Sequence, residues 1–294
     1  MPTDLSLLPP HAQFLHIYRR LKENRELFDR TPIVFCEGDS WFSTPLAMNI
    51  LDWLVFPTPE EEERGVPLVG RGGLFYRDEK SGSLATEMFT REGIRKLMAP
   101  YKAFEFDIAL LSGGGNDFVG DFLKTTFARK PEMTVSEAFA VVAGTGRFAQ
   151  VKLAYESVLT AMIAARPKTR IVGHTYAYPL RMGAPADLTL ANIGAVALLK
   201  KNAGPWIGKN MEGVLPARDD QKAFARRLID AFAEEVMLPL AADRRFRGNF
   251  RVIDLRNDCP SESDWFDEMH PTGACFHRLS RKFQDQIRDL FVIG

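Results

Sequence analysis

Apolar residues along this chain form short continuous runs, which alternate with longer segments where they recur every three or four positions. Continuous runs at 32–36, 106–111, 170–176 and 250–255 are typical of strands buried on both faces. Helical spacing marks 11–28, 46–55, 83–98, 151–165, 219–240 and 273–290. A shorter strand is expected near 74–76. Strands that alternate with helices predict an α/β sandwich around a mostly parallel sheet.

Two long segments, 118–147 and 181–218, interrupt this alternation. Insertions of this kind often form lids or substrate walls, and we expect that role for both. The chain has no internal repeat, low-complexity tract or clear linker. We therefore expect one domain over 1–294, with an N-terminal helix at about 11–28 docked on it.

Polar residues that can carry chemistry follow several of the predicted strands. Ser40, Asn116 and His174 each come at or just after the end of an apolar run, and Asp267 and His270 follow the last run. The reactive groups of a parallel sheet gather outside the carboxyl ends of its strands. We therefore expect these residues to meet at one edge of the sheet.

Three short motifs contain the groups needed for acyl transfer through a serine: GDSW at 38–41, GGND at 114–117 and DEMHP at 267–271. A serine hydroxyl is a poor nucleophile until a base takes its proton. His270 is the candidate base for Ser40, and Asp267 is close enough in sequence to orient it. The Ser40 N–H and the Asn116 amide are candidate donors to a tetrahedral oxyanion.

These motifs resemble those of the SGNH (GDSL-type) hydrolases, and the resemblance spans most of the chain. It implies a flavodoxin-like, three-layer α/β/α fold and ester hydrolysis through an acyl-enzyme. It also implies a third oxyanion donor, a glycine N–H. Gly82 is our choice for this donor because a helix is expected directly after it, and Gly73 is the rival. Trp41 stands where Leu is usual in the first motif, which affects the pocket wall rather than the catalytic groups.

Substrate contacts are expected from Asp39, Trp41 and His174. The resemblance permits acetylated sugars, lipids, thioesters and small esters. Of the tryptophans, Trp41, Trp206 and Trp265 are candidates for a sugar platform or for simple packing. Neither a cofactor nor a metal is expected, and the expected partner is a small-molecule ester or acylated substrate.

Two alternatives remain open. In a metal-dependent phosphoesterase, Asp39, Asn116, Asp267 and His270 would be ligands of a two-metal site. In a catalytically silent binding module of the same fold, Ser40 would be ordered but unused. A GxGxxA match at 144–149 lacks the acidic residue that a dinucleotide site needs after the next strand, so we set it aside.

The charge balance and the cysteines narrow the setting. Lys and Arg number 38, as do Asp and Glu, so nothing favours a nucleic-acid partner. No apolar stretch is long enough to span a membrane, and the first residues do not look like a signal peptide. The three cysteines are an odd number, which makes a disulfide framework unexpected. Cys36, Cys259 and Cys275 are interpreted as core-filling residues, and a cytoplasmic protein is expected.

Overall fold

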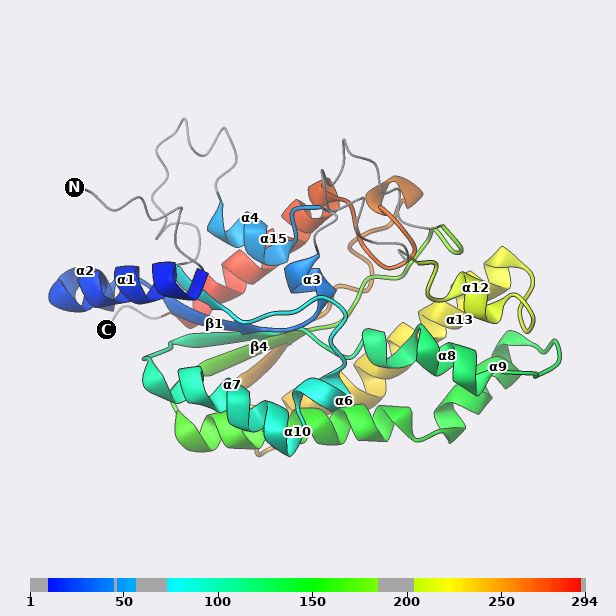
Figure 1. Cartoon of the computed structure of the whole chain (residues 1–294), viewed down its shortest axis with the longest axis horizontal. Coiled ribbons are helices and arrows are strands. Elements are labelled where there is room, and N and C mark those ends of the chain that lie inside the picture. Colours follow the sequence, from blue (N-terminus) through cyan, green and yellow to red (C-terminus); the bar gives the residue numbers. More distant parts are fainter. Residues whose placement is uncertain (1–9, 45–46, 57–72, 185–203, 292–294) are drawn as a thin grey trace.

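A five-stranded parallel sheet forms the centre of the protein (Figure 1). The computed structural model describes residues 10–44, 47–56, 73–184 and 204–291. The strands are β1 (Ile33–Glu37), β2 (Leu74–Arg77), β3 (Ile108–Leu111), β4 (Arg170–His174) and β5 (Phe250–Ile253). They lie in the order β2-β1-β3-β4-β5, and every neighbouring pair is parallel. Each predicted strand is present, and the predicted parallel α/β class is confirmed.

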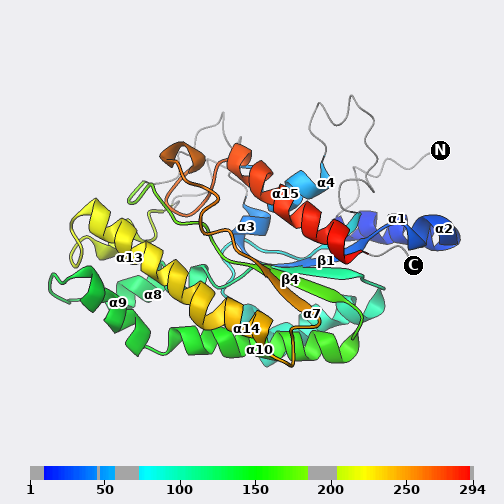
Figure 2. The ribbon, with the colours of Figure 1, turned by 180° about the vertical axis from the view of Figure 1, so that it is seen from behind.

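Helices cover both faces of this sheet, which gives three layers. Figures 1 and 2 show α4 (Ile50–Val55) and α15 (Gly273–Leu290) on one face, with α7 (Arg91–Ala103), α10 (Arg147–Ala165) and α14 (Leu238–Ala242) on the other. The three inner strands are almost wholly buried, as the continuous apolar runs predict. Helices on both faces leave the carboxyl edge of the strands as the place where polar groups gather.

The predicted helix at 83–98 is two helices, α6 (Ala85–Met88) and α7. Thr90 lies between them in extended conformation, and its side chain accepts a hydrogen bond from the Gly93 N–H. A side-chain acceptor at this position satisfies an amide that has no partner within the helix, so a new helix begins at Arg91.

The predicted helix at 219–240 is continuous but changes geometry. It comprises α13 (Arg218–Ala231), a π-helix η5 (Phe232–Met237) and α14. Pro239 explains the change, because it has no N–H to donate to the carbonyl four residues earlier and its ring crowds that carbonyl. The wider turn begins at Phe232, whose ring packs against Gly114 in the turn after β3.

The remaining elements connect these layers. At the amino-terminal end of the described chain, α1 (Pro10–Glu23) and α2 (Arg25–Asp29) replace the single helix expected at 11–28. The other short elements are α3 (Ser40–Ser43), η3 (Asn116–Phe118), α8 (Asp121–Thr126), α9 (Val135–Gly144), α12 (Gly208–Met211) and η6 (Glu262–Asp264). The 118–147 segment is therefore largely helical. Much of the 181–218 segment lies outside the described residues, as does most of the loop expected at 57–73.

An aromatic cluster on β1, β2 and the residues before β3 holds α1 on the sheet. Phe14 of α1 packs against Tyr76 of β2 with ring centroids 5.1 Å apart, and against Phe104 at the same distance. Phe35 of β1 lies 5.3 Å from Phe106 in the same cluster. Many of the phenylalanines are thus used for packing far from the candidate active-site edge.

Cys259 and Cys275 form a disulfide, which the odd cysteine count made unexpected, although both are buried in the core as expected. Their Cα atoms are 6.6 Å apart. The chain between them folds back on itself, with Trp265 and Pro271 paired as an antiparallel bridge. This return brings Cys259 to the first turn of α15, which contains Cys275. Cys36 is free and buried in β1.

Within the part of the chain that is described, no helix combines the length and apolar character required to cross a bilayer.

Candidate active site

Ser40 is the first residue of α3, directly beyond the carboxyl end of β1. Gly38 permits this turn, because a Cβ there would lie 2.6 Å from the Cβ of Ser112, which follows the neighbouring strand β3. Asp39 caps α3 by accepting a hydrogen bond from the Trp41 N–H at 3.0 Å. As the first residue of a helix, Ser40 has an N–H with no partner inside that helix.

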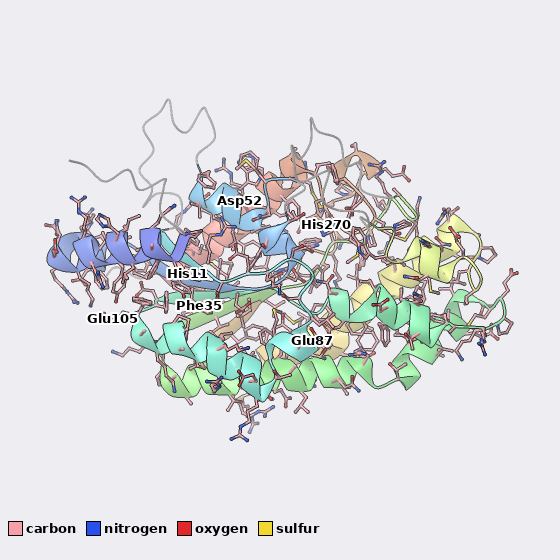
Figure 3. The ribbon with its side chains drawn as sticks, in the orientation of Figure 1. His11, Phe35, Asp52, Glu87, Glu105 and His270 are labelled. Atoms are coloured by element: carbon pink, nitrogen blue, oxygen red, sulfur yellow. A yellow bond between two sulfur atoms is a disulfide. The ribbon has the colours of Figure 1, made fainter. Side chains whose placement is uncertain are left out.

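His270 and Asp267 meet Ser40 from a loop 230 residues away in sequence. The Nε2 atom of His270 is 2.9 Å from the Ser40 Oγ. Its Nδ1 lies 2.9 Å and 3.1 Å from the two carboxylate oxygens of Asp267. A carboxylate only accepts, so Nδ1 carries the proton and Nε2 is free to accept one from Ser40. Figure 3 shows His270 close to α3.

The loop itself is shaped by the same carboxylate. The N–H groups of Met269 and His270 both donate to Asp267 Oδ1, at 2.7 Å and 2.8 Å. The indole N–H of Trp41 donates to the Met269 carbonyl at 3.2 Å, which ties this loop to α3. Asp267 is fully buried, and the two backbone N–H groups satisfy its carboxylate there. One side chain therefore both forms the turn and orients the imidazole.

Asn116 follows β3 through a turn of three glycines. Gly114 has a φ of +111°, and a Cβ there would come within 2.5 Å of the Phe232 ring. A Cβ on Gly115 would come within 3.0 Å of the Tyr176 ring. The turn can thus pass closely between two aromatic side chains and present Asn116 beside Ser40. The Asn116 Nδ2 donates one hydrogen bond, to the Ser83 carbonyl at 3.0 Å, and has a second proton to donate.

A cavity of about 60 Å³ opens beside Ser40 and Asn116. Asp39 and Trp41, two of the three residues expected to contact the substrate, line this cavity. Most of its walls are apolar and come from η3 and the residue after it, from α13 and η5, from the residue before α12, and from the loop before α15. These apolar lining residues include Phe118, Val119, Ile207, Leu228, Phe232 and Met269.

Comparison with solved structures identifies the fold. A lipase from a goat rumen metagenome superposes with a TM-score of 0.53 and 13% identity, over 87% of this chain and 97% of that one. An extracellular lipase from Streptomyces rimosus gives a TM-score of 0.45, 15% identity, and 89% and 100% coverage. A carbohydrate esterase of family 3 from Talaromyces cellulolyticus gives 0.45, 12%, and 88% and 98%. The chain has the SGNH hydrolase fold.

The strand order β2-β1-β3-β4-β5 is the flavodoxin-like order that this fold implies. The resemblance found in the three motifs is therefore confirmed at the level of the fold. No protein-family model matches the sequence, and no curated protein matches it significantly.

The sheet register places the two candidate glycines, Gly82 and Gly73, at opposite ends of the strands. Leu74 pairs with Ile33, so Gly73 lies at the amino end of the strands, away from Ser40. Gly82 lies beyond their carboxyl end, two residues after Lys80, whose N–H donates to the Gly38 carbonyl. Gly82 has a φ of +82° and does not line the cavity beside Ser40.

Asp117, a residue to which the sequence gives no separate role, connects this turn to the Asn116 turn. Its carboxylate accepts from the Ala85 N–H at 2.7 Å and from the Thr86 N–H and hydroxyl at 3.2 Å and 2.5 Å. Burial raises the pKa of Asp117, while the hydrogen bonds from Thr86 and Ala85 lower it. The carboxylate thus fixes the start of α6, and with it the Gly82 turn, relative to Asn116.

A second serine, histidine and aspartate contact one another behind the nucleophile. Ser112 Oγ donates to Asp39 Oδ1 at 2.8 Å, and His174 Nε2 lies 2.8 Å from the same Oγ. The Tyr176 hydroxyl donates to Asp39 Oδ2 at 2.5 Å, and His174 Nδ1 donates to the Thr175 carbonyl at 2.8 Å. Burial lowers the pKa of His174.

The geometry of this second set differs from that of a catalytic triad. Its serine stands between the other two groups, and Ser112 and His174 are buried and do not line the cavity. Its visible effect is to hold Asp39, which caps the helix that begins at Ser40. Asp39 therefore lines the cavity, whereas His174, expected to contact the substrate, is buried behind Asp39 and does not line it. Both of its ring nitrogens already have hydrogen-bond partners.

The four residues that a two-metal site would need already bond to other groups. Asp39 accepts from Ser112 and Tyr176, Asp267 faces His270, and Asn116 donates to the Ser83 carbonyl. Among the described residues, no group of three or more His, Cys, Asp or Glu side chains is arranged to hold a metal ion.

Proposed function

We propose that this protein is a serine ester hydrolase that acts through an acyl-enzyme. The observation that carries the proposal is the 2.9 Å contact between His270 Nε2 and Ser40 Oγ, with Asp267 on the other ring nitrogen. It has the connectivity that an activated serine requires, and it lies at the mouth of an apolar cavity.

In the first step Ser40 Oγ attacks the ester carbonyl while its proton passes to His270 Nε2. The resulting imidazolium is stabilised by the buried Asp267 carboxylate. The carbonyl oxygen becomes an oxyanion, for which we assign three donors: the Ser40 N–H, the second proton of Asn116 Nδ2, and the Gly82 N–H. Donors already in place cost no reorganisation when the charge develops.

In the second step the tetrahedral intermediate collapses. His270 gives its proton to the departing alkoxide, the carbon–oxygen bond of the ester breaks, and Ser40 remains acylated. Water then attacks the acyl group while His270 takes one of its protons. When this intermediate collapses, His270 returns the proton to Ser40 and the acid leaves.

The cavity size favours a short acyl group. An apolar cavity of about 150 Å³ holds a benzene molecule, and the space beside Ser40 is about 60 Å³. Its aliphatic and aromatic walls favour an apolar acyl group over a sugar ring in this space. Trp41 and Trp265 are buried in those walls, so they offer no open platform. We therefore expect acetate and propionate esters to be better substrates than long-chain esters.

The test is hydrolysis of p-nitrophenyl esters from acetate to palmitate by the wild type and by Ser40→Ala, each with and without EDTA. Ser43→Ala, at the other end of α3, is the matched control. We expect hydrolysis that EDTA does not affect, that Ser43→Ala retains, and that Ser40→Ala loses by several orders of magnitude. Hydrolysis that survives in Ser40→Ala, or that disappears only with EDTA, would contradict the serine mechanism.

A further inference from the structure

Glu268 lies between Asp267 and His270 in sequence, yet it takes no part in the chemistry above. Its side chain is fully buried. One oxygen, Oε2, accepts from the Gly183 N–H at 2.9 Å and from the Gly208 N–H at 3.0 Å. The other, Oε1, accepts from the Ile207 N–H. A buried carboxylate costs free energy unless donors surround it, and here three backbone amides supply them.

These amides come from two parts of the chain that lie against each other. A Cβ on Gly208 would come within 2.7 Å of the Gly183 Cα, and a Cβ on Gly183 within 2.1 Å of Arg218 Nη1. Gly208 therefore needs to be glycine because a side chain would collide with the Gly183 backbone, while Gly183 favours glycine because its φ is +71°. Glu268 closes this junction from the side of the His270 loop.

The junction determines what stands next to His270. Trp206 meets the imidazole edge to face, with ring centroids 5.4 Å apart and an interplanar angle of 81°. The Trp206 carbonyl accepts from the Gly120 N–H at 3.0 Å and from Asn210 Nδ2 at 2.7 Å. The next residue, Ile207, is buried and forms part of the cavity wall.

We propose that Glu268 is a positioning residue that sets the acyl-chain selectivity of the site. It does so by fixing Ile207 as a wall of the cavity and Trp206 against His270. The inference rests on the proposed ester hydrolysis and adds a determinant of its substrate range. Glu268 also lines the cavity, but both of its carboxylate oxygens accept from backbone amides and we assign it no contact with the reacting atoms.

Glu268→Gln tests this idea with little change of volume. The amide nitrogen that replaces one oxygen donates and cannot accept, so at least one of the three backbone amides loses its partner. Burial raises the pKa of Glu268, and the hydrogen bonds from Ile207, Gly208 and Gly183 lower it. A neutral glutamine keeps the shape but not these bonds, so the Ile207 wall should become mobile.

The experiment compares the wild type with Glu268→Gln and Ile207→Ala, and uses Glu262→Gln as a matched control on an exposed glutamate of the same loop. For each, kcat and KM are measured with p-nitrophenyl acetate, butyrate and octanoate. We expect the ratio of kcat/KM for acetate over octanoate to fall about tenfold in both test variants, the scale on which apolar pockets discriminate methylene groups. Glu262→Gln should match the wild type.

Hydrogen exchange of the backbone amides at 204–211 gives a readout that needs no substrate. We expect faster exchange there in Glu268→Gln and unchanged exchange in Glu262→Gln. If the wild type shows no hydrolysis that depends on Ser40, the proposed function fails, and exchange alone still reports on the junction.

Two results would overturn the inference while leaving the proposed function intact. The first is a Ser40-dependent hydrolase in which Glu268→Gln changes neither the acetate-to-octanoate ratio nor the exchange at 204–211. The second is a uniform loss of activity on all three esters with an unchanged ratio, which would mean only a structural role. Should Glu268→Gln fail to fold, an unchanged ratio in Ile207→Ala would also overturn it.

Discussion

Asp267 illustrates how the spacing of the DxxH motif follows from local geometry. Its Oδ1 accepts from the N–H groups two and three residues later, at 2.7 Å and 2.8 Å. This is the turn that Asp side chains favour. It brings the imidazole of His270, three residues after Asp267, onto the same carboxylate. A shorter or longer spacing would separate the turn from the orientation of the base. The motif could therefore be interpreted from sequence, because its chemistry is contained in four consecutive residues.

Asn116→Ala tests the oxyanion assignment at the scale of one side chain. The substitution removes the amide proton that we assign to the transition state, so kcat should fall about 10²–10³-fold while KM changes little. Steady-state kinetics on p-nitrophenyl acetate measures this. Asn249→Ala is the control, because the Asn249 side chain also donates to backbone carbonyls and lies just before β5, at the amino end of the strands. A fall in kcat below about tenfold for Asn116→Ala would remove this residue from the oxyanion site.

Glu37, at the end of β1, predicts a pH dependence of stability. Burial, with the nearby Asp78 carboxylate as the next cause, raises the pKa of Glu37 from 4.5 to about 8. A carboxyl group with a raised pKa in the folded state keeps its proton there while the unfolded chain has lost it. Stability from this group is therefore complete below pH 4.5 and is lost as the pH rises to about 8.

The measurement is urea unfolding at several pH values between 5 and 8.5 for the wild type and Glu37→Gln. At about 1.4 kcal/mol per pKa unit, the wild type should lose roughly 4 kcal/mol more than the variant between pH 5 and pH 8.5. Glutamine keeps the acceptor for the Gly38 N–H without titrating. Glu132→Gln, at an exposed position, should follow the wild type. Parallel curves for wild type and Glu37→Gln would show that Glu37 titrates normally.

At the scale of elements, the strands could be predicted because each is a continuous apolar run with a turn signal after it. The long helix predicted at 219–240 could be placed, but its π-helical turn could not, because that turn results from Pro239 within a helix that packs along its whole length. The hydrogen bonds of Glu268 could not be predicted from the sequence either. They join backbone amides from 183 and 207–208, and a backbone amide has no sequence signature.

Gly114→Ala tests the glycine turn between β3 and η3. Alanine would adopt a φ of +111° and place its Cβ within 2.5 Å of the Phe232 ring. Left-handed backbone costs about 1–2 kcal/mol and overpacking about 1–3 kcal/mol, so the unfolding free energy should fall by roughly 2–5 kcal/mol. Because the turn carries Asn116, kcat should fall as well.

Gly146→Ala is the matched control for this prediction. Gly146 has a φ of +74°, but nothing lies within 4 Å of a Cβ placed on it. It should therefore lose only about 1–2 kcal/mol and keep its kcat. Chemical unfolding and ester kinetics on both variants separate backbone strain from contact with Phe232. Equal losses in the two variants would mean that the Phe232 contact is relieved at no cost.

At the scale of the whole molecule, the cysteine count misled the sequence interpretation. An odd number argues against a full disulfide framework but not against one pair beside one buried thiol. Cys259 and Cys275 meet because the loop between them returns to the start of α15, a contact that the sequence does not reveal. Disulfides persist mainly in oxidising compartments. The pair therefore removes the cysteine-based support for a cytoplasmic location.

The Cys259–Cys275 link should stabilise the fold and the site together. Its sequence separation is 16, and Asp267 and His270 both lie inside the closed loop. A cross-link over a loop of this length stabilises by about 3 kcal/mol, mainly by restricting the unfolded chain. The double variant Cys259→Ala/Cys275→Ala should therefore lose about 3 kcal/mol beyond the cost of removing two buried sulfur atoms, and its kcat should fall as the base becomes less fixed.

Cys36→Ala gives the cost of removing one buried, unpaired cysteine and is the control. Thiol titration of the denatured, unreduced protein should find one free thiol, since only Cys36 is unpaired. Three free thiols, or a loss no larger than twice that of Cys36→Ala, would show that the loop holds the base without the cross-link.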